Sequence, residues 1–163
     1  MTAASTSARA PSESAIVYLM AEVPFVNVLD FMMVNPLGPD LARDLAVPTS
    51  LLPAIAGSYT AAASVSGLAA AFLLDRYARR PALVLALVGL AVGTALGGFA
   101  TGLGSLLAAR VLAGIFGGPA TSLAFAIVAD AIPSERRGWA MGGGLGGFAG
   151  GSVLGGAVGL ELA

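Results

Sequence analysis

The chain contains no cysteine, no histidine and no lysine among its 163 residues. Their absence excludes a disulfide framework, thiol and imidazole metal sites, a histidine general base and a lysine-based phosphate loop. Charged residues make up only 10% of the chain, whereas roughly a quarter is usual for soluble domains. The net charge of −1 offers no basic surface for nucleic acid. We therefore predict a non-enzymatic protein with no metal, no cofactor and no nucleic-acid partner.

Long hydrophobic runs take the place of charge. Hydrophobic residues make up 57% of the chain, and about 20 consecutive apolar residues suffice for a helix that crosses a bilayer. Five runs meet this length, at about residues 15–36, 51–74, 82–102, 105–128 and 139–160. The first run is too long for the apolar part of a signal peptide and contains Glu22 and Asp30, so we expect it to be retained. We predict an all-α membrane protein with five transmembrane helices.

The arginines are distributed unevenly between the two ends of these runs. Six lie in the N-terminal tail and after the second and fourth runs: Arg9, Arg76, Arg79, Arg80, Arg136 and Arg137. The opposite side has only Arg43. Because cytoplasmic loops are enriched in Lys and Arg, we expect a cytoplasmic N-terminus, in a plasma membrane such as the inner membrane of a bacterium. Residues 1–14 are small and polar, which predicts a disordered cytoplasmic tail ahead of a membrane domain at 15–163.

The segment after the second run combines an acid with its arginines, in the stretch AFLLDRYARR. An acidic residue contributes little to cytoplasmic orientation, so the pattern indicates a specific ion-pair geometry. The stretch resembles the signature G-x-x-x-D-R-x-G-R-R between helices 2 and 3 of the major facilitator superfamily. The matching residues are Asp75, Arg76, Arg79 and Arg80, while Ala71 and Ala78 stand at the glycine positions. The resemblance implies that the four charged residues form a cytoplasmic latch that holds the outward-facing state.

Three further stretches resemble signatures of the same family. RVLAGIFGG is similar to the fourth-helix signature R-x-x-Q-G, through Arg110 and Gly114. LDFMMVNPLGP is similar to the first-helix signature L-D-x-x-x-V-N-x-x-x-P of drug–proton antiporters, through Asp30 and Asn35 among others. GFAGGSVLGG resembles the fifth-helix antiporter signature G-x-x-x-G-P-x-x-G-G, with Ser152 at the proline position. Its matching glycines are Gly147, Gly151, Gly155 and Gly156.

The resemblance implies a fold and a function. Members of the family usually have twelve helices in two halves, and each half is a pair of three-helix inverted repeats. The chain is therefore expected to form five helices of an N-terminal half-bundle, apparently truncated. The implied function is secondary transport, with proton-coupled efflux of small amphipathic compounds by alternating access. The expected partners are the lipid bilayer, a small-molecule substrate, protons, and either the missing half or a second copy of the chain.

Asp30 is the candidate proton-exchanging group. A charged side chain at the centre of a membrane helix costs about 2.5–3.5 kcal/mol on insertion scales, and burial favours the neutral form of a carboxyl group. Arg110 stays charged at any depth, and in this family its helix and that of Asp30 line the central cavity, so we expect the two to pair. Asn27, Glu22 and Asn35 are expected to belong to the same proton-coupling and substrate site, with plain solvation of Glu22 as an alternative. Simple packing of Asp30, and extension of Arg110 toward the outer interface, remain alternatives.

Glycines recur every four residues in the last hydrophobic run, at Gly143, Gly147, Gly151, Gly155 and Gly159. Four residues advance a helix by about 400°, so these positions form a nearly straight groove that a second helix can approach closely. In the family the facing helix belongs to the other half of the transporter, which is where we expect this groove to pack.

Two alternative functions fit the same sequence. In the first, the protein is a proton-independent facilitator of sugars or metabolites, and Asp30 binds substrate. In the second, it is a truncated membrane scaffold that associates through its glycine groove and transports nothing.

Overall fold

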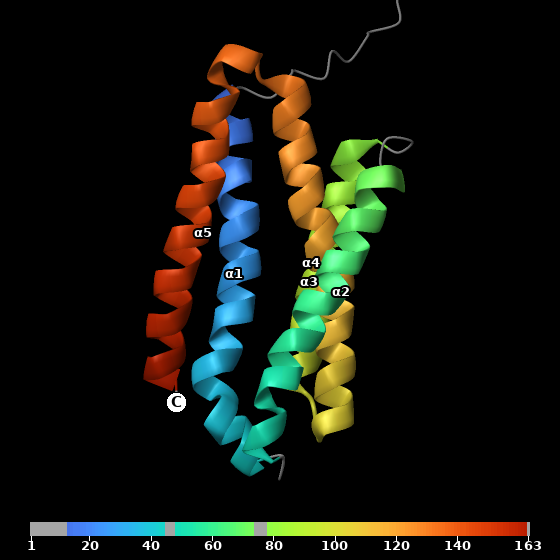
Figure 1. Ribbon diagram of the computed structural model, residues 1–163, viewed down its shortest axis with the longest axis vertical. Coiled ribbons are helices and arrows are strands. Elements are labelled where there is room, and N and C mark those ends of the chain that lie inside the picture. The colour runs from blue at the N-terminus through green and yellow to red at the C-terminus, as the bar shows by residue number, and fades with distance from the viewer. Residues whose placement is uncertain (1–12, 45–47, 74–77, 163) are drawn as a thin grey trace, which may run out of the picture.

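A computed structural model describes residues 13–44, 48–73 and 78–162 of the chain (Figure 1). The elements are α1 (Glu13–Asp44), the 3-10 helix η1 (Thr49–Leu51), α2 (Leu52–Leu73), α3 (Arg79–Gly98), α4 (Leu103–Ala131) and α5 (Ser134–Leu162). Residues 1–12 of the predicted tail lie outside the described residues, as do Asp75 and Arg76. Residues 13 and 14 begin α1, so the prediction of disorder is wrong for these two. All regular structure in the described ranges is helical, which confirms the all-α prediction.

Each helix coincides with one of the five hydrophobic runs, but the helices differ in their ability to cross a membrane. Within the described residues, three segments are long and apolar enough for a span: Leu52–Phe72, Arg79–Gly98 and Leu103–Ala131. The helix α1 carries acidic residues along its length, and α5 is rich in glycine with charged residues in its first turns. Three spans are therefore supported by composition, and the spans of α1 and α5 stay predictions.

Local sequence explains the bounds and the buried faces of these helices. In α3 the buried residues are Leu83, Ala86, Leu90 and Gly93, and their spacing of three and four residues places them on one helical face. The helix α4 ends at Ala131, just before a proline that disfavours helical conformation in the residue preceding it.

The helices form two groups, which are side by side in Figure 1. In one group α1 packs along α5, and in the other α4 packs against both α2 and α3. The helix α4 also contacts α1 and thereby joins the groups. The main core lies between them, toward the end where α4 connects to α5, and includes Met20, Leu83, Leu123 and Ala140. A smaller cluster of Tyr59, Leu90 and Ala113 lies beyond it and supports the site described below.

The glycine groove of α5 packs against α1 of the same chain, so the expectation that it faces another half is wrong. A Cβ added at Gly147 would overlap the carbonyl oxygen of Ala21, and one added at Gly151 would lie 2.7 Å from the carbonyl oxygen of Phe25. Gly155 faces α1 in the same way. The absence of side chains on this face lets the backbones of α5 and α1 approach closely. In this bundle α1 is the helix that packs along α5.

The other two predicted packing glycines behave differently. A Cβ at Gly114 would lie 2.5 Å from the carbonyl oxygen of Tyr59, so Gly114 permits close packing of α4 on α2. No atom of another helix lies within 4 Å of a Cβ added at Gly156. Gly156 is therefore not part of the contact between α1 and α5.

Candidate functional site

The helices α1 and α4 bring Asp30 and Arg110 into direct contact, forming what we call the buried pair. Arg110 Nη2 lies 2.6 Å from Asp30 Oδ2, and Arg110 Nη1 lies 3.5 Å from Asp30 Oδ1. The side chain of Arg110 is only 6% exposed and that of Asp30 only 7% exposed. Charge-assisted contacts of this length are among the stronger hydrogen bonds in proteins, and burial removes the solvent that would otherwise screen the charges.

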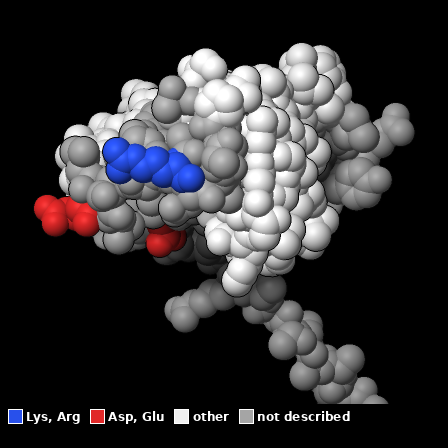
Figure 2. All heavy atoms as spheres, turned by 90° about the horizontal axis from the view of Figure 1, so that it is seen from below, with Lys and Arg blue, Asp and Glu red and all other residues white. Residues whose placement is uncertain are grey.

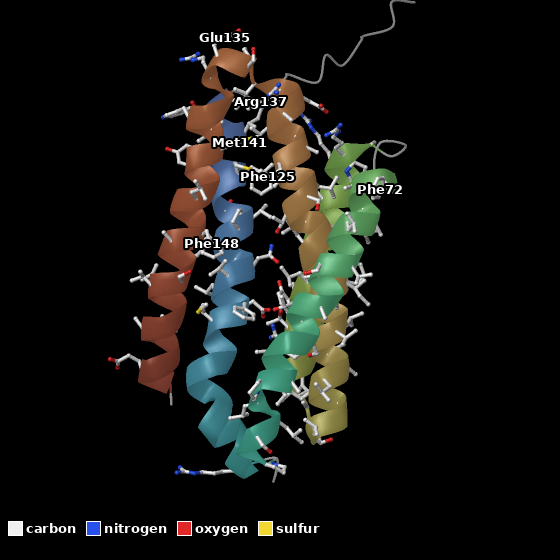
Figure 3. All side chains as sticks on the ribbon, viewed as in Figure 1. Phe72, Phe125, Glu135, Arg137, Met141 and Phe148 are labelled. Atoms are coloured by element: carbon white, nitrogen blue, oxygen red, sulfur yellow. The ribbon has the colours of Figure 1, made fainter. Side chains whose placement is uncertain are left out.

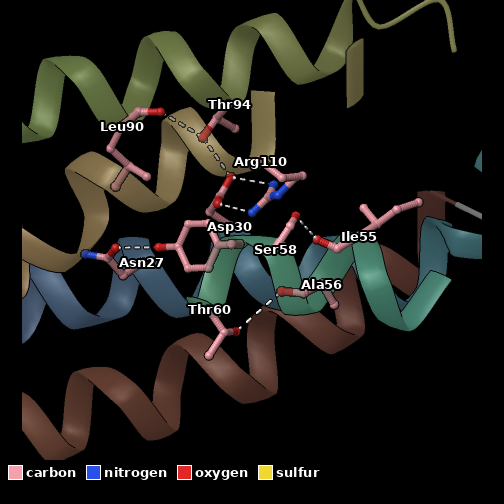
Figure 4. A network of polar contacts seen from close by, with 10 residues as sticks. Asn27, Asp30, Ile55, Ala56, Ser58, Thr60, Leu90, Thr94 and Arg110 are labelled. Carbon is pink, nitrogen blue, oxygen red and sulfur yellow. Dashed lines mark hydrogen bonds and ion pairs between the residues drawn. The ribbon is translucent and has the colours of Figure 1, made fainter. Parts of the chain in front are cut away.

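The helix α3 adds a third member, Thr94. Its hydroxyl oxygen lies 2.8 Å from Asp30 Oδ1 and 2.9 Å from the carbonyl oxygen of Leu90 (Figure 4). A hydroxyl carries a single proton, so Thr94 donates to only one of these oxygens at a time. The sequence analysis did not identify Thr94. Its signal was available, because Thr94 is the only polar side chain in α3 after Arg80.

The helix α2 covers the buried pair with the ring of Tyr59. The guanidinium carbon of Arg110 lies 4.9 Å from the ring centroid, a distance at which the ring's negative face attracts a cation. Phe31 packs beside this ring at a centroid distance of 6.1 Å. Tyr59 is 7% exposed. Its position over the guanidinium was not predicted, since a tyrosine in a membrane helix gives no indication of which neighbour it faces.

Asn27 belongs to the same network through Tyr59. The Tyr59 hydroxyl donates to Asn27 Oδ1 at 2.7 Å, and Asn27 Nδ2 donates to the carbonyl oxygen of Val23 at 3.0 Å. A Cβ at Gly117 would lie within 2.6 Å of both Asn27 Oδ1 and the Tyr59 hydroxyl oxygen. The absence of a side chain at Gly117 thus leaves room for this bond.

A groove of about 560 Å³ lies on the other side of Tyr59, and we call it the central groove. It is bordered by α1, α2 and α4, with Phe148 contributed by α5 (Figure 3). Hydroxyl groups in its lining come from Tyr59, Thr60, Ser64, Thr121 and Ser122. Among the described residues no charged side chain lines it, and neither member of the buried pair does. Tyr59 and Asn27 therefore separate the charges from the groove.

Glu22 does not join this site. It is exposed and lines a different groove, about 550 Å³ in volume, together with Tyr18, Phe25 and glycines of α5. Glu22 and Asp30 are eight residues apart, which separates them by about 80° around α1. That rotation moves Glu22 out of the packed sector of the helix, so the expectation that it borders the cavity of Asp30 is not met. The side chain of Asn35 lies outside the described part of the structure.

Charged residues gather at the end of the bundle where α4 connects to α5. Arg79 Nε lies 2.9 Å from Asp130 Oδ2, and these side chains are 29% and 58% exposed; we call them the surface pair. Arg137 Nη2 donates to the carbonyl oxygen of Ala129 at 2.6 Å, which satisfies a free carbonyl at the end of α4. Figure 2 shows the opposite end, where one basic side chain and a few acidic groups interrupt an otherwise uncharged described surface.

The surface pair joins two elements of one half-bundle. Arg79 begins α3 and Asp130 lies in the last turn of α4. Of the four predicted latch residues, Arg79 and Arg80 are described, and Arg80 is exposed. Glu135, at the start of α5, has its pKa lowered by hydrogen bonds from its own backbone N–H and from the Ser134 hydroxyl.

The family model described as Major Facilitator Superfamily matches residues 23–163. No curated protein and no solved structure matches the chain significantly. The family match covers most of the chain, including the segments of both pairs and of the central groove. Together with the apolar helices α2, α3 and α4, it identifies an integral membrane protein in contact with the lipid bilayer. The chain belongs to the major facilitator superfamily of membrane transporters.

Proposed function

We propose that the protein is a secondary active transporter that exports small amphipathic compounds in exchange for protons, by alternating access. The observation that carries this proposal is a buried, mutually neutralising acid–base pair that contacts Tyr59, a residue that also lines a groove with no charged side chain in its described lining. The groove holds the substrate, and the pair responds to the proton. The N-terminus faces the cytoplasm of a plasma membrane.

The proton acts at Asp30. Among the described residues Asp30 is the only buried acid, and Arg110 cannot give up its own proton under ordinary conditions. A proton that binds the Asp30 carboxylate removes its charge and leaves the Arg110 guanidinium without a counter-charge. A buried charge that loses its partner is strongly destabilising. Protonation therefore favours a second conformation in which Arg110 finds other partners or water.

The central groove defines the class of substrate. Its volume of about 560 Å³ lies within the range of about 300–1,000 Å³ that is usual for small-molecule sites. Phe31, Tyr59 and Phe148 supply aromatic surface, while hydroxyl groups supply hydrogen bonds. Because no charged side chain lines the described groove, a neutral aromatic compound with a few polar groups fits better than a sugar or an ion.

Tyr59 links the two events. It lines the central groove, and its ring lies against the guanidinium of Arg110. A substrate that moves this ring changes the surroundings of the buried pair, and a change in the pair moves the ring. Thermodynamic coupling of this kind is reciprocal, so substrate binding alters proton binding as much as the reverse.

The cytoplasmic latch completes the proposed cycle. The surface pair joins α3 to α4 within this half, and Asp75, Arg76 and Arg80 are proposed to extend the ion pairs to a second half-bundle or a second copy of the chain. These contacts hold the outward-facing state, and they open to give the inward-facing state that takes up substrate from the cytoplasm.

The test is substrate-driven proton movement in proteoliposomes, with a panel of neutral and cationic fluorescent aromatic compounds. The chain and any longer product of the same reading frame are compared with Asp30→Asn. Neutral compounds are expected to drive proton release that Asp30→Asn abolishes. The matched control is Glu22→Gln, which removes an exposed acid from the same helix and is expected to leave proton release intact.

The alternatives give different results. A proton-independent facilitator would transport without proton release, and Asp30→Asn would change substrate affinity alone. A scaffold would transport nothing in any form. Either result contradicts the proposal.

A further inference from the structure

The buried pair has one contact that leads out of the bundle. Asp30 and Arg110 are both buried, and neither lines the central groove. In the described structure, two further side chains make a hydrogen bond or a ring contact with the pair, Thr94 and Tyr59, and Tyr59 is buried. Thr94 is exposed, although its hydroxyl lies 2.8 Å from Asp30 Oδ1. Within the described structure, Thr94 therefore connects the Asp30 carboxyl group to the surface of the bundle.

The position of Thr94 along α3 indicates which side of the membrane this connection faces. Thr94 precedes Gly98, the last residue of α3, by one helical turn. This end of α3 is opposite the end that carries the surface pair of Arg79 and Asp130. In the proposed topology it faces the outside, so Thr94 lies close to outer water.

The Thr94 hydroxyl can satisfy both protonation states of Asp30 without moving its oxygen. When Asp30 is ionised, Thr94 donates its proton to Asp30 Oδ1. When Asp30 carries a proton on Oδ1, the acid donates to Thr94 Oγ1, and Thr94 turns its own proton to the carbonyl oxygen of Leu90 at 2.9 Å. A hydroxyl can donate and accept at the same time, so Thr94 and Asp30 Oδ1 stay hydrogen-bonded to each other in both states.

We propose that the Thr94 hydroxyl relays protons between outer water and Asp30, by a path separate from the substrate groove. A hydronium ion at the outer end gives a proton to Thr94 Oγ1 while the original Thr94 proton passes to Asp30 Oδ1. One O–H bond forms at each acceptor and one breaks at each donor, which leaves neutral water, an unchanged threonine and a neutral Asp30. This proposal rests on the proposed proton-coupled function.

The charged and titratable groups around Asp30 are few. Arg110 of α4 faces Asp30 directly, and Tyr59 of α2 lies against Arg110. The helix α3 contributes the Thr94 hydroxyl. Replacing Thr94 thus changes the route of the proton while leaving the neighbouring charge in place.

The experiment measures how fast Asp30 takes up a proton. The chain is reconstituted in phosphatidylcholine vesicles of one orientation, and the outer solution is acidified rapidly. The infrared C=O absorption of a protonated carboxyl group is followed over time, and the component missing in Asp30→Asn is assigned to Asp30. The variants are Thr94→Val, which keeps the shape but removes the hydroxyl, and Thr94→Ser, which keeps the hydroxyl.

A third variant controls for loss of a hydroxyl bond within a helix. Ser152→Ala removes a hydroxyl that donates to the carbonyl oxygen of Phe148 at 2.9 Å, as Thr94 does to Leu90. Thr94→Val is expected to slow proton uptake by roughly 100-fold, the lower end of what a positioned proton-transfer group contributes. Thr94→Ser and Ser152→Ala are expected to keep the parent rate, with unchanged helicity by circular dichroism.

The remaining outcomes of this experiment either support or overturn the proposed path. Uptake by Thr94→Val at the parent rate overturns it. If Thr94→Val fails to fold, the sidedness of the parent decides: uptake that follows outer acidification supports the path, and uptake only from the opposite side overturns it. If the parent shows no band that Asp30→Asn removes at any pH, the proposed proton function itself fails.

Discussion

Two ion pairs of this bundle have the same chemistry and opposite surroundings. The buried pair is 6% and 7% exposed, at a shortest N–O distance of 2.6 Å. The surface pair is 29% and 58% exposed, at 2.9 Å. The distances differ little, whereas water reaches the surface pair and hardly reaches the other. Burial, more than geometry, should therefore decide what each pair contributes to stability and to transport.

The largest expected effect comes from breaking the buried pair on one side. Asp30→Ala leaves the Arg110 guanidinium buried without a counter-charge, and we expect the free energy of unfolding to fall by about 3–5 kcal/mol. The measurement is chemical unfolding in lipid–detergent bicelles, followed by circular dichroism.

The double variant separates stability from function. Asp30→Leu combined with Arg110→Met removes both charges, and apolar replacement of a buried pair is often neutral or stabilising. We expect it to recover most of the lost stability and none of the proton release. If Asp30→Ala costs no more than removal of a surface charge, burial is not what distinguishes the pairs.

The sequence predicted the helices better than it predicted their neighbours. Hydrophobic runs located all five helices, although only α2, α3 and α4 are long and apolar enough for a span among the described residues. Helical periodicity states which residues share a face, but it does not state which helix that face meets. Asp30 and Arg110 could be matched because buried charges need partners. Thr94 has no such requirement, and the glycines of α5 fit α1 as well as any other helix.

The contact between α5 and α1 allows a comparison of a packed and an open position that involves no charge. Gly147 meets the backbone of α1, and Gly156 meets open space. We expect Gly147→Val to lower the free energy of unfolding by at least about 1–3 kcal/mol, as overpacking of a close contact does. Gly156→Val carries the same change in helix propensity and controls for it. Equal losses in the same unfolding assay would contradict the contact between α1 and α5.

Substitutions of Tyr59 test whether this side chain couples the central groove to the buried pair. Tyr59→Phe keeps the ring over Arg110 but leaves the buried Asn27 Oδ1 without its donor, which should cost about 1–3 kcal/mol. Tyr59→Leu also removes the ring. We expect Tyr59→Phe to retain part of the substrate-driven proton release and Tyr59→Leu to lose the coupling while still binding substrate, measured by fluorescence and pH recording in the same vesicles. Full coupling in Tyr59→Leu would exclude Tyr59 as the link.

The smallest effect on stability is expected at the surface pair. Asp130→Asn should change the free energy of unfolding by only about 0–1 kcal/mol, and added salt should remove even that difference because exposed charges are screened. Its effect on conformation should be larger if the pair belongs to the proposed latch. The chain has no cysteine, so Ser64→Cys places a single thiol in the central groove, and its alkylation rate from the cytoplasmic side reports how often the groove opens there. We expect Asp130→Asn to raise the alkylation rate while the free energy of unfolding stays unchanged. An equal alkylation rate in the two proteins would show that the surface pair does not hold the groove closed.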